Sequence, residues 1–186
     1  MSGKNEKYPF IVKKDLPSAN QLTEKYTSIE HDLSSLEKYH FKIARNKDWN
    51  TIDIKLTQLP TVQSWHELGL FQKRDSGNNP VAEIVVKIIK IKNEISPAKV
   101  LEKMLEETYQ DKNLEILNQQ TFDSSQGLVK DVLFKYFYEN VNFVSRMTVF
   151  STGREMVLIQ GNASEKDYNV FALDFYMAIS SFNFVK

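Results

Sequence analysis

The sequence contains no cysteine, which excludes disulfide bonds, thiolate metal sites and a cysteine nucleophile. It has only six glycines, and each is expected alone at a turn or at the end of a strand. A phosphate-binding loop needs clustered glycines that let backbone N–H groups approach the anion, and no such cluster, P-loop or GxSxG element is present. These absences argue against nucleotide-dependent enzymes and serine hydrolases.

An excess of charge of either sign is also missing, since 24 lysines and arginines balance 24 acidic residues. No global field favours nucleic acid, so we expect no nucleic-acid partner. No apolar run approaches the roughly 20 residues that span a bilayer, and the start, MSGKNEKYPF, has no signal-peptide core. Two interpretations stay open: a cytosolic protein, or a mature lipoprotein whose leader was removed.

Histidines are few, and their positions suggest no reactive site. His31 has no ligand partner four residues later, and His66 and Glu67 would point to opposite faces of a strand. Two acids interrupt apolar segments: Asp131 is expected at a solvent-facing or edge position, and Asp174 on the polar face of the last helix. We therefore expect no catalytic residue, no cofactor site and no metal site, and predict that the protein is not an enzyme.

The N-terminal part divides into two segments. Residues 1–14 are polar and lysine-rich around the small apolar cluster of residues 8–12, and are interpreted as a flexible arm or tether. Residues 15–39 carry apolar side chains at spacings of 4, 3, 4 and 3, which predicts one helix with a single apolar stripe. The stripe runs through Leu22, Tyr26, Ile29, Leu33 and Leu36.

Residues 40–186 are expected to form a single α+β domain. Alternating apolar residues predict strands at 41–43, 52–56, 65–72 and 81–91. The last of these is apolar on both faces, so helices are expected on both sides of the sheet. Ser96 and Pro97 begin a helix, four hairpin-connected strands follow, and Ser164 caps a final aromatic-rich helix. The predicted fold is an antiparallel sheet of about six or seven strands between helices, plus an N-terminal helix and arm.

Aromatic residues in the strands supply the candidate interaction residues. Phe134, Tyr136 and Tyr138 would share one face of a strand, and Arg146 on the adjoining strand is the best candidate for an exposed anchor. Core packing is favoured for this aromatic strand over a stacking platform for single-stranded nucleic acid, and one of its faces could line a groove for a protein. The candidates for protein interaction are Tyr136, Tyr138, Arg146 and Trp65.

The order of elements from Phe41 to Lys186 resembles the PsbP-like fold family, which includes the DcrB-like bacterial lipoproteins. The resemblance rests on PAKVLEKML at 97–105, the strand end LIQG at 158–161, YMAISSF at 176–182, and FKI at 41–43 followed by Trp49. It implies mostly non-enzymatic adaptors, assembly factors and envelope lipoproteins, and it carries over no functional residue, because the fold has no shared catalytic set. Residues 15–39 lie outside it.

We therefore expect a non-enzymatic protein-binding or assembly domain, associated with a bacterial envelope and belonging to a larger complex. Its partner would be a protein, and membrane contact would occur only through a lipid anchor absent from this chain. That reading places the protein in the periplasm or tethered to the outer membrane. Two alternatives stay open: a cytoplasmic adaptor or chaperone for another protein, and a small-molecule carrier or enzyme with a pocket between the sheet and the last helix.

Overall fold

The computed structural model describes residues 7–31, 39–52, 54, 64–92, 95–124, 127–152 and 155–185. Their elements are, in chain order, the 3-10 turn η1 (Lys13–Asp15), α1 (Ala19–Lys25), β1 (Tyr26–His31), β2 (Phe41–Asn46), β3 (Asn50–Ile52), β4 (His66–Arg74), β5 (Pro80–Lys90), α2 (Pro97–Tyr109), β6 (Glu115–Ser124), β7 (Gly127–Tyr138), β8 (Val141–Ser151), β9 (Glu155–Ser164), α3 (Tyr168–Ser181) and β10 (Asn183–Phe184). The arrangement is α+β, as the sequence predicts.

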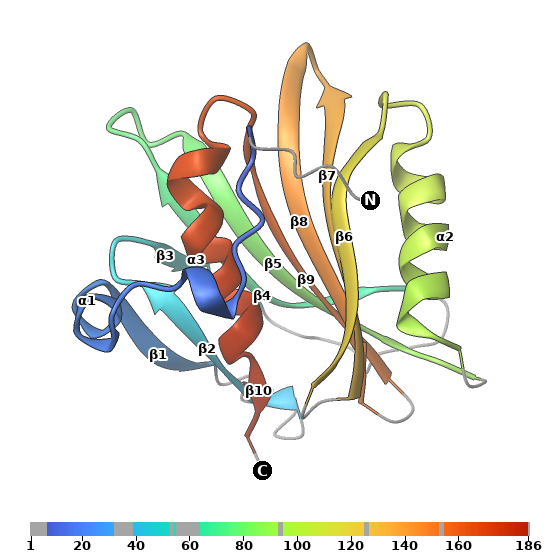
Figure 1. Ribbon diagram of the computed structural model, residues 1–186, viewed down its shortest axis with the longest axis horizontal. Helices are drawn as coiled ribbons and strands as arrows, with labels where there is room; N and C mark the ends of the chain where they lie inside the picture. The colour runs from blue at the N-terminus through green and yellow to red at the C-terminus, as the bar shows by residue number, and fades with distance from the viewer. Residues whose placement is uncertain are drawn as a thin grey trace.

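The centre of the molecule is a seven-stranded antiparallel sheet in the order β3-β4-β5-β9-β8-β7-β6 (Figure 1). Helix α3 packs on one face of this sheet and α2 on the other. Strand β5 shows why both faces are covered. Ile84, Val86 and Ile88 are buried in the core beneath α3, whereas Ile89 packs with the residues beneath α2. The expected strand number and the helices on both faces are confirmed.

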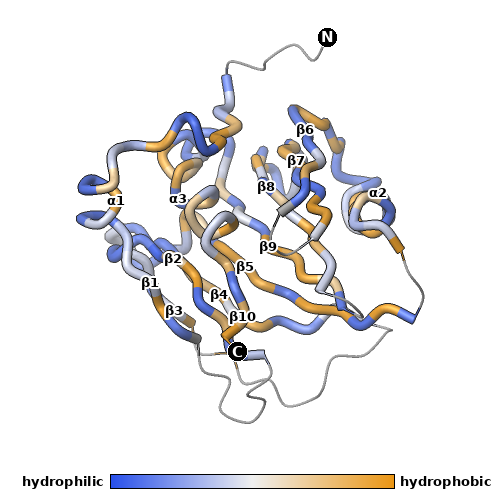
Figure 2. Tube along the Cα trace, turned by 60° about the horizontal axis from the view of Figure 1, so that its bottom comes forward, coloured by the Kyte–Doolittle hydropathy of each residue, from blue (hydrophilic) through white to orange (hydrophobic). Residues whose placement is uncertain are grey.

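The two helices close two separate cores. On one side, Leu101, Leu105 and Tyr109 of α2 pack on the sheet, and the Ser96 side chain caps the helix by accepting a hydrogen bond from the Lys99 N–H at 3.3 Å. On the other side, Phe175 and its helical neighbours are buried on β5, β8 and β9, and hydrophobic residues follow α3 and β5 in Figure 2. Each fully buried large side chain contributes about 1.5–3 kcal/mol.

A second sheet, which the sequence did not predict, joins β1, β2 and β10. The predicted helix over residues 15–39 is wrong, because α1 ends at Lys25 and the chain continues as β1. Residues 26–30 include aromatic and β-branched side chains suited to a strand, and Ile29 pairs with Ile43 of β2. The apolar residues that match helical spacing are divided between the short helix α1 and the strand β1. Leu33 and Leu36 lie outside the described residues.

The N-terminal segment also differs from the expected arm. Residues 7–12 lie along α3, and Tyr8 is only 5% exposed, with its ring edge-on to Tyr168 at 6.3 Å. The apolar cluster that interrupts the polar arm therefore belongs to the core. Helix α3 begins later than predicted, with Asp167 at its N-cap, because Ser164 is still the last residue of β9. Of the predicted strand at 52–56, only Ile52 is in a described strand, and most of the rest lies outside the described residues.

Candidate functional site

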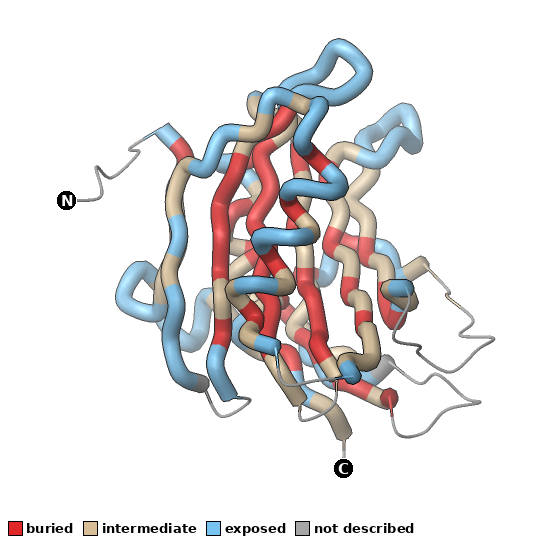
Figure 3. The backbone as a smooth tube through the Cα atoms, turned by 90° about the vertical axis from the view of Figure 1, so that its right-hand side faces the viewer, coloured by how far each residue is buried: buried red, intermediate tan, exposed pale blue. Residues whose placement is uncertain are grey.

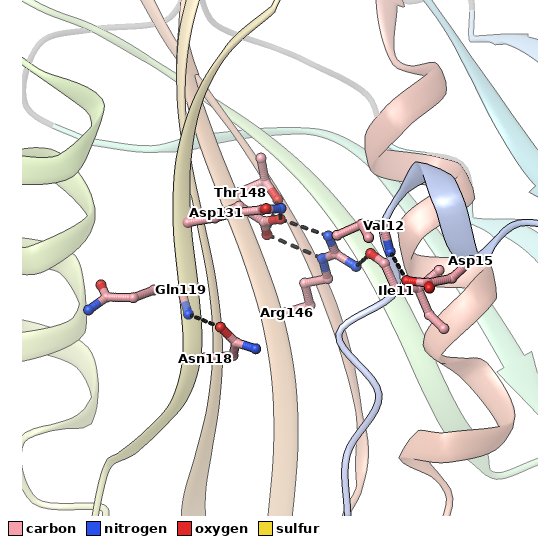
Figure 4. Close-up of polar contacts among 9 residues, drawn as sticks. Ile11, Val12, Asp15, Asn118, Gln119, Asp131, Arg146 and Thr148 are labelled. Carbon is pink, nitrogen blue, oxygen red and sulfur yellow. Dashed lines mark hydrogen bonds and ion pairs between the residues drawn. The ribbon is translucent and has the colours of Figure 1, made fainter. Parts of the chain in front are cut away.

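The most buried charged pair of the described chain lies on the α3 side of the sheet, where Arg146 of β8 meets Asp131 of β7 (Figure 4). Arg146 Nε donates to Asp131 Oδ1 at 3.2 Å and Nη2 donates to Oδ2 at 2.7 Å, and each side chain is only 1% exposed. Thr148 and Gln120 also donate to this carboxylate, at 2.9 and 2.8 Å. Such a bidentate, charge-assisted arrangement fixes both groups in one geometry.

Strand alternation explains why both charges point inward. Asp131 lies between Val129 and Leu133, whose side chains belong to the core beneath α3. Thr148 is the cross-strand partner of Asp131, and Arg146 is two residues before it, so all three share this face. The expectation that Asp131 marks an exposed or edge position is wrong. Arg146 is likewise not an exposed anchor, since each charge satisfies the other in the interior.

The N-terminal segment covers the guanidinium of Arg146. The carbonyl of Ile11 accepts a hydrogen bond from Arg146 Nη1 at 2.7 Å (Figure 4). The ring of Phe10 lies 4.4 Å from the guanidinium carbon, and the ring of Tyr176 on α3 lies 5.3 Å from it. Arg146 therefore connects the sheet, the last helix and the N-terminal segment through one planar cation.

A pocket of about 390 Å³ opens beside this pair, between α3 and strands β6–β8. We call it the α3-side pocket. Arg146, Asp131 and Thr148 form its polar part, and Val12 and Lys13 of the N-terminal segment line it as well. Its apolar wall consists of Phe122, Val129, Phe150, Ile179 and Phe182. The pocket thus lies between the sheet and the last helix, where the carrier alternative expected one.

A second buried polar group links α3 to the small sheet. The carboxylate of Asp174 is 3% exposed and accepts hydrogen bonds from the Tyr26 hydroxyl and, at 3.2 Å, from the Asn46 amide. Lys25 Nζ lies 3.1 Å from the same carboxylate. Burial and the neighbouring Asp174 raise the pKa of Tyr26, so its hydroxyl stays a donor. The sequence suggested that Asp174 lies on the polar face of the last helix. This expectation is wrong, because the side chain is buried.

Tyr136 lies in the core beneath α2 and is 7% exposed. Its ring is 4.7 Å from Tyr109 and stacks on Phe143 at 5.4 Å, and its hydroxyl donates to Asn162 at 3.1 Å. Desolvation by burial raises the pKa of this phenol. The structure thus places Tyr136 in the core packing that the sequence favours for its strand.

Tyr138 is exposed, at the tip of the β7–β8 hairpin. Its side chain is 46% exposed beside the 41% exposed Val141, and the Lys112 ammonium lies 4.9 Å from its ring. Glu139 and Asn140 both have positive φ, which is the geometry of a two-residue type I′ turn. Strands β7 and β8 are thus joined by a two-residue turn at Glu139 and Asn140.

Trp65 packs against the same core beneath α2 that contains Tyr136. It is partly buried and lines a separate hollow of about 510 Å³ between α2 and the end of β5, together with Ile89, Ile91 and Met104. Arg146 lies on the opposite face of the sheet, and Tyr138 lies on the hairpin tip. The structure does not bring the four predicted residues together in one site.

The outer edge of β6 is a surface that the sequence did not reveal. Within the described residues, β6 ends the order of the seven-stranded sheet and pairs only with β7. In Figure 3, the buried central strands contrast with this largely exposed edge strand. Ile116 is 45% exposed and Phe122 is 40% exposed. Whether a strand lies at the edge of a sheet depends on the order of all the strands, and a local sequence pattern does not reveal that order.

Neither a cluster of metal ligands nor a membrane-spanning helix occurs in the described ranges. No group of three His, Asp or Glu side chains there is close enough to hold a metal ion. No helix in those ranges is both long enough and apolar enough to cross a bilayer.

The sequence matches no protein-family model and no curated protein. The structure is similar to LpqN, described as involved in cell envelope biogenesis of Mycobacterium tuberculosis, with a TM-score of 0.58 and 10% identity over 94% of this chain and 98% of that one. It is also similar to the cyanobacterial PsbP protein CyanoP from Synechocystis sp. PCC 6803, with a TM-score of 0.57 and 12% identity over 87% and 93%.

A third similar structure is protein PA94 from Pseudomonas aeruginosa, described as a putative regulator of unknown function. Its TM-score is 0.53, at 10% identity over 72% of this chain and 94% of that one. Identities this low establish a shared architecture and nothing about activity. Together with the seven-stranded sheet between α2 and α3, these similarities show that the chain has the PsbP-like fold.

Proposed function

We propose that the chain is a non-enzymatic, envelope-associated protein-binding domain whose partner adds an extended segment to the outer edge of β6. The observation that carries the proposal is the composition of this edge, EILNQQTFDS, which contains no lysine, arginine or proline over ten residues. Proteins usually protect a long edge strand with such residues, because its unpaired backbone groups otherwise recruit another strand. Apart from one irregularity in its pairing with β7, between Ile116 and Asn118, this edge offers the backbone groups that strand addition requires.

The side chains of β6 indicate the chemistry of the partner segment. Ile116 and Phe122 pair with Phe134 and Val129, whose side chains lie on opposite faces of the sheet. An added strand would therefore need apolar residues on both of its faces. Glu115 and Asp123 near the two ends favour a segment with lysine or arginine opposite them. We propose an extended, apolar and basic segment of another protein.

Two arguments support a non-enzymatic domain in an envelope. The buried carboxylates Asp131 and Asp174 are held by several donors each, which leaves them little freedom to move protons for a substrate. The similar structure LpqN is described as involved in cell envelope biogenesis. Fractionation of cells that express the native gene would test the location: recovery in the periplasm or membrane fraction supports it, and recovery in the cytosol favours the adaptor alternative.

Binding at β6 can be tested by placing a photo-crosslinking residue at Thr121, which is exposed on this strand. The crosslinked partner segment is then synthesised, and amide hydrogen exchange is measured with and without it. Strand addition should slow the exchange of the β6 amides selectively. Protection at another surface, with β6 unchanged, would contradict the proposal, and a β6–β6 crosslink between two copies would assign the edge to a homodimer instead.

A matched pair of variants makes the test specific. Ile116→Lys places a charge on the exposed edge and should weaken segment binding by about tenfold or more. Val170→Lys is its control, since Val170 is an exposed aliphatic residue on α3, at 67% exposure, away from β6. Equal affinities of the two variants would show that the edge is not the binding surface.

The small-molecule carrier is a second candidate function, and the α3-side pocket is the observation that favours it. Pockets of about 300–1,000 Å³ with an apolar wall and a few polar groups commonly bind small organic ligands.

A further inference from the structure

We infer that the α3-side pocket binds an amphipathic monocarboxylate, with its carboxylate at Arg146 and its apolar body against Val129, Phe150 and Ile179. This site is independent of strand addition at β6 and goes beyond it. The pocket has about 390 Å³, and one part of its wall is charged while the rest is mainly apolar. A cavity with one polar part and one apolar part selects a ligand that is divided in the same way.

The guanidinium of Arg146 supplies the donors. An arginine has five N–H groups. The described residues provide acceptors for three of them: the two oxygens of Asp131 and the carbonyl of Ile11. One N–H on each terminal nitrogen is left for a further acceptor, and Arg146 lines the pocket. A guanidinium N–H donates a charge-assisted hydrogen bond to a carboxylate, which is stronger than one to a neutral acceptor.

The charge of the pocket also favours an anion. Among the residues that line it, Lys13 and Arg146 are cationic and Asp131 is anionic, which is an excess of one positive charge, carried by the exposed Lys13 beside the buried pair. A singly charged carboxylate neutralises this excess, whereas a cation or a dianion does not. Because Arg146 is buried, water screens its attraction for an anion less than it would at an exposed arginine.

The apolar part suits a flexible hydrocarbon or a small ring. Val129, Phe150 and Phe182 are buried residues of the core beneath α3, and Ile179 packs against them. Burying a methylene group there is worth about 0.8 kcal/mol. The core alone does not call for a charged pair at this place, since apolar residues of similar volume generally stabilise an interior equally well or better. Binding of a ligand carboxylate at Arg146 would explain why a charged pair occupies this position.

Octanoate and 1-octanol are suitable probes, because they share a chain and differ in the head group. Titration of the labelled protein with each, followed by NMR, should show octanoate binding at least about tenfold more tightly, with shifts at Val129, Phe150 and Ile179. Equal affinities, no binding of octanoate, or shifts confined to another surface would each overturn the inference.

Two sets of variants locate the binding. Ser180→Trp should fill the pocket from α3 and abolish octanoate binding, while Val170→Trp, an exposed position on the same helix, should leave it unchanged. The variant Asp131→Leu/Arg146→Met/Thr148→Val replaces the charged cluster with apolar residues and should remove the preference for octanoate over 1-octanol. A preference retained in this variant, with its fold verified by NMR, would show that Arg146 does not bind the carboxylate.

Discussion

The carboxylate of Asp174 in α3 accepts a hydrogen bond from the hydroxyl of Tyr26, the first residue of β1, 148 residues earlier in the chain. Both side chains are buried, and Asn46 of β2 donates to the same carboxylate. The small sheet is therefore attached to the last helix through this buried acceptor, in addition to the hydrogen bond that the Ala44 N–H donates to the Ser181 hydroxyl at 2.7 Å.

Asp174→Ala should lower the free energy of unfolding by about 2–4 kcal/mol, because it leaves the Tyr26 hydroxyl and the Asn46 amide buried without their acceptor. Urea denaturation measures the loss. Lys25→Ala is the control: it removes the 43% exposed partner of the same carboxylate and should cost about 1 kcal/mol or less. Equal losses in the two variants would mean that the buried hydrogen bonds contribute no more than the exposed ion pair.

Arg146→Met should destabilise the protein by about 3–5 kcal/mol, since Asp131 then remains buried without a cation. The triple variant Asp131→Leu/Arg146→Met/Thr148→Val removes the unpaired charge and should recover most of this loss. Chemical denaturation of both variants measures the difference. A triple variant that is as unstable as Arg146→Met would indicate that packing around the guanidinium, rather than its charge, stabilises this region.

Features with a local cause were predictable from the sequence. The alternation of β5 requires cover on both faces, and Ser96 with Pro97 marks the start of α2, so the layers of the fold followed from short segments. The spacing from Leu22 to Ile29 was misleading, because positions 3 and 4 apart also occur where a helix passes into a strand. Only the pairing of Ile29 with Ile43 separates the two cases, and pairing is not local.

The candidate site depends on relationships across the whole chain. An arginine on an alternating strand usually faces solvent. Arg146 can be buried because Asp131 on the adjoining strand neutralises its charge, and because the Ile11 carbonyl, 135 residues away, accepts a further hydrogen bond from its guanidinium. The sequence singles out Asp131 and Arg146 separately, but their contact depends on the register of β7 with β8. The edge position of β6 likewise depends on strand order.

The acid dependence of stability should include a contribution from Glu165. Hydrogen bonds from Tyr8, Lys7 and Lys135 lower its pKa from the ordinary 4.5 to about 2. A carboxylate with a lowered folded-state pKa stabilises the protein above pH 4.5, and this contribution is lost as the pH falls towards 2. The side chain is 21% exposed, so solvent screening limits the effect to about 1 kcal/mol.

Glu165→Gln should therefore be less stable than the wild type at pH 6, and the difference should shrink as the pH falls from 4.5 to 2. Urea denaturation at several pH values measures it. Glu106→Gln, on the exposed side of α2, should show no such convergence. A stability difference for Glu165→Gln that does not change with pH would contradict the ion-pair explanation.

Gly161 of β9 lies directly beneath Phe175 of α3. A methyl group at this position would overlap the Phe175 ring and come within 2.8 Å of its Cβ, so α3 itself would have to move away from the sheet. Gly161→Ala should therefore destabilise the protein by about 1–3 kcal/mol, although alanine adds only one carbon. Gly77→Ala, in the β4–β5 turn, is the control, because its nearest neighbour is the flexible amide of Asn79 at 3.0 Å. Thermal or urea denaturation compares the two, and equal stability would show that α3 does not lie this close to the sheet.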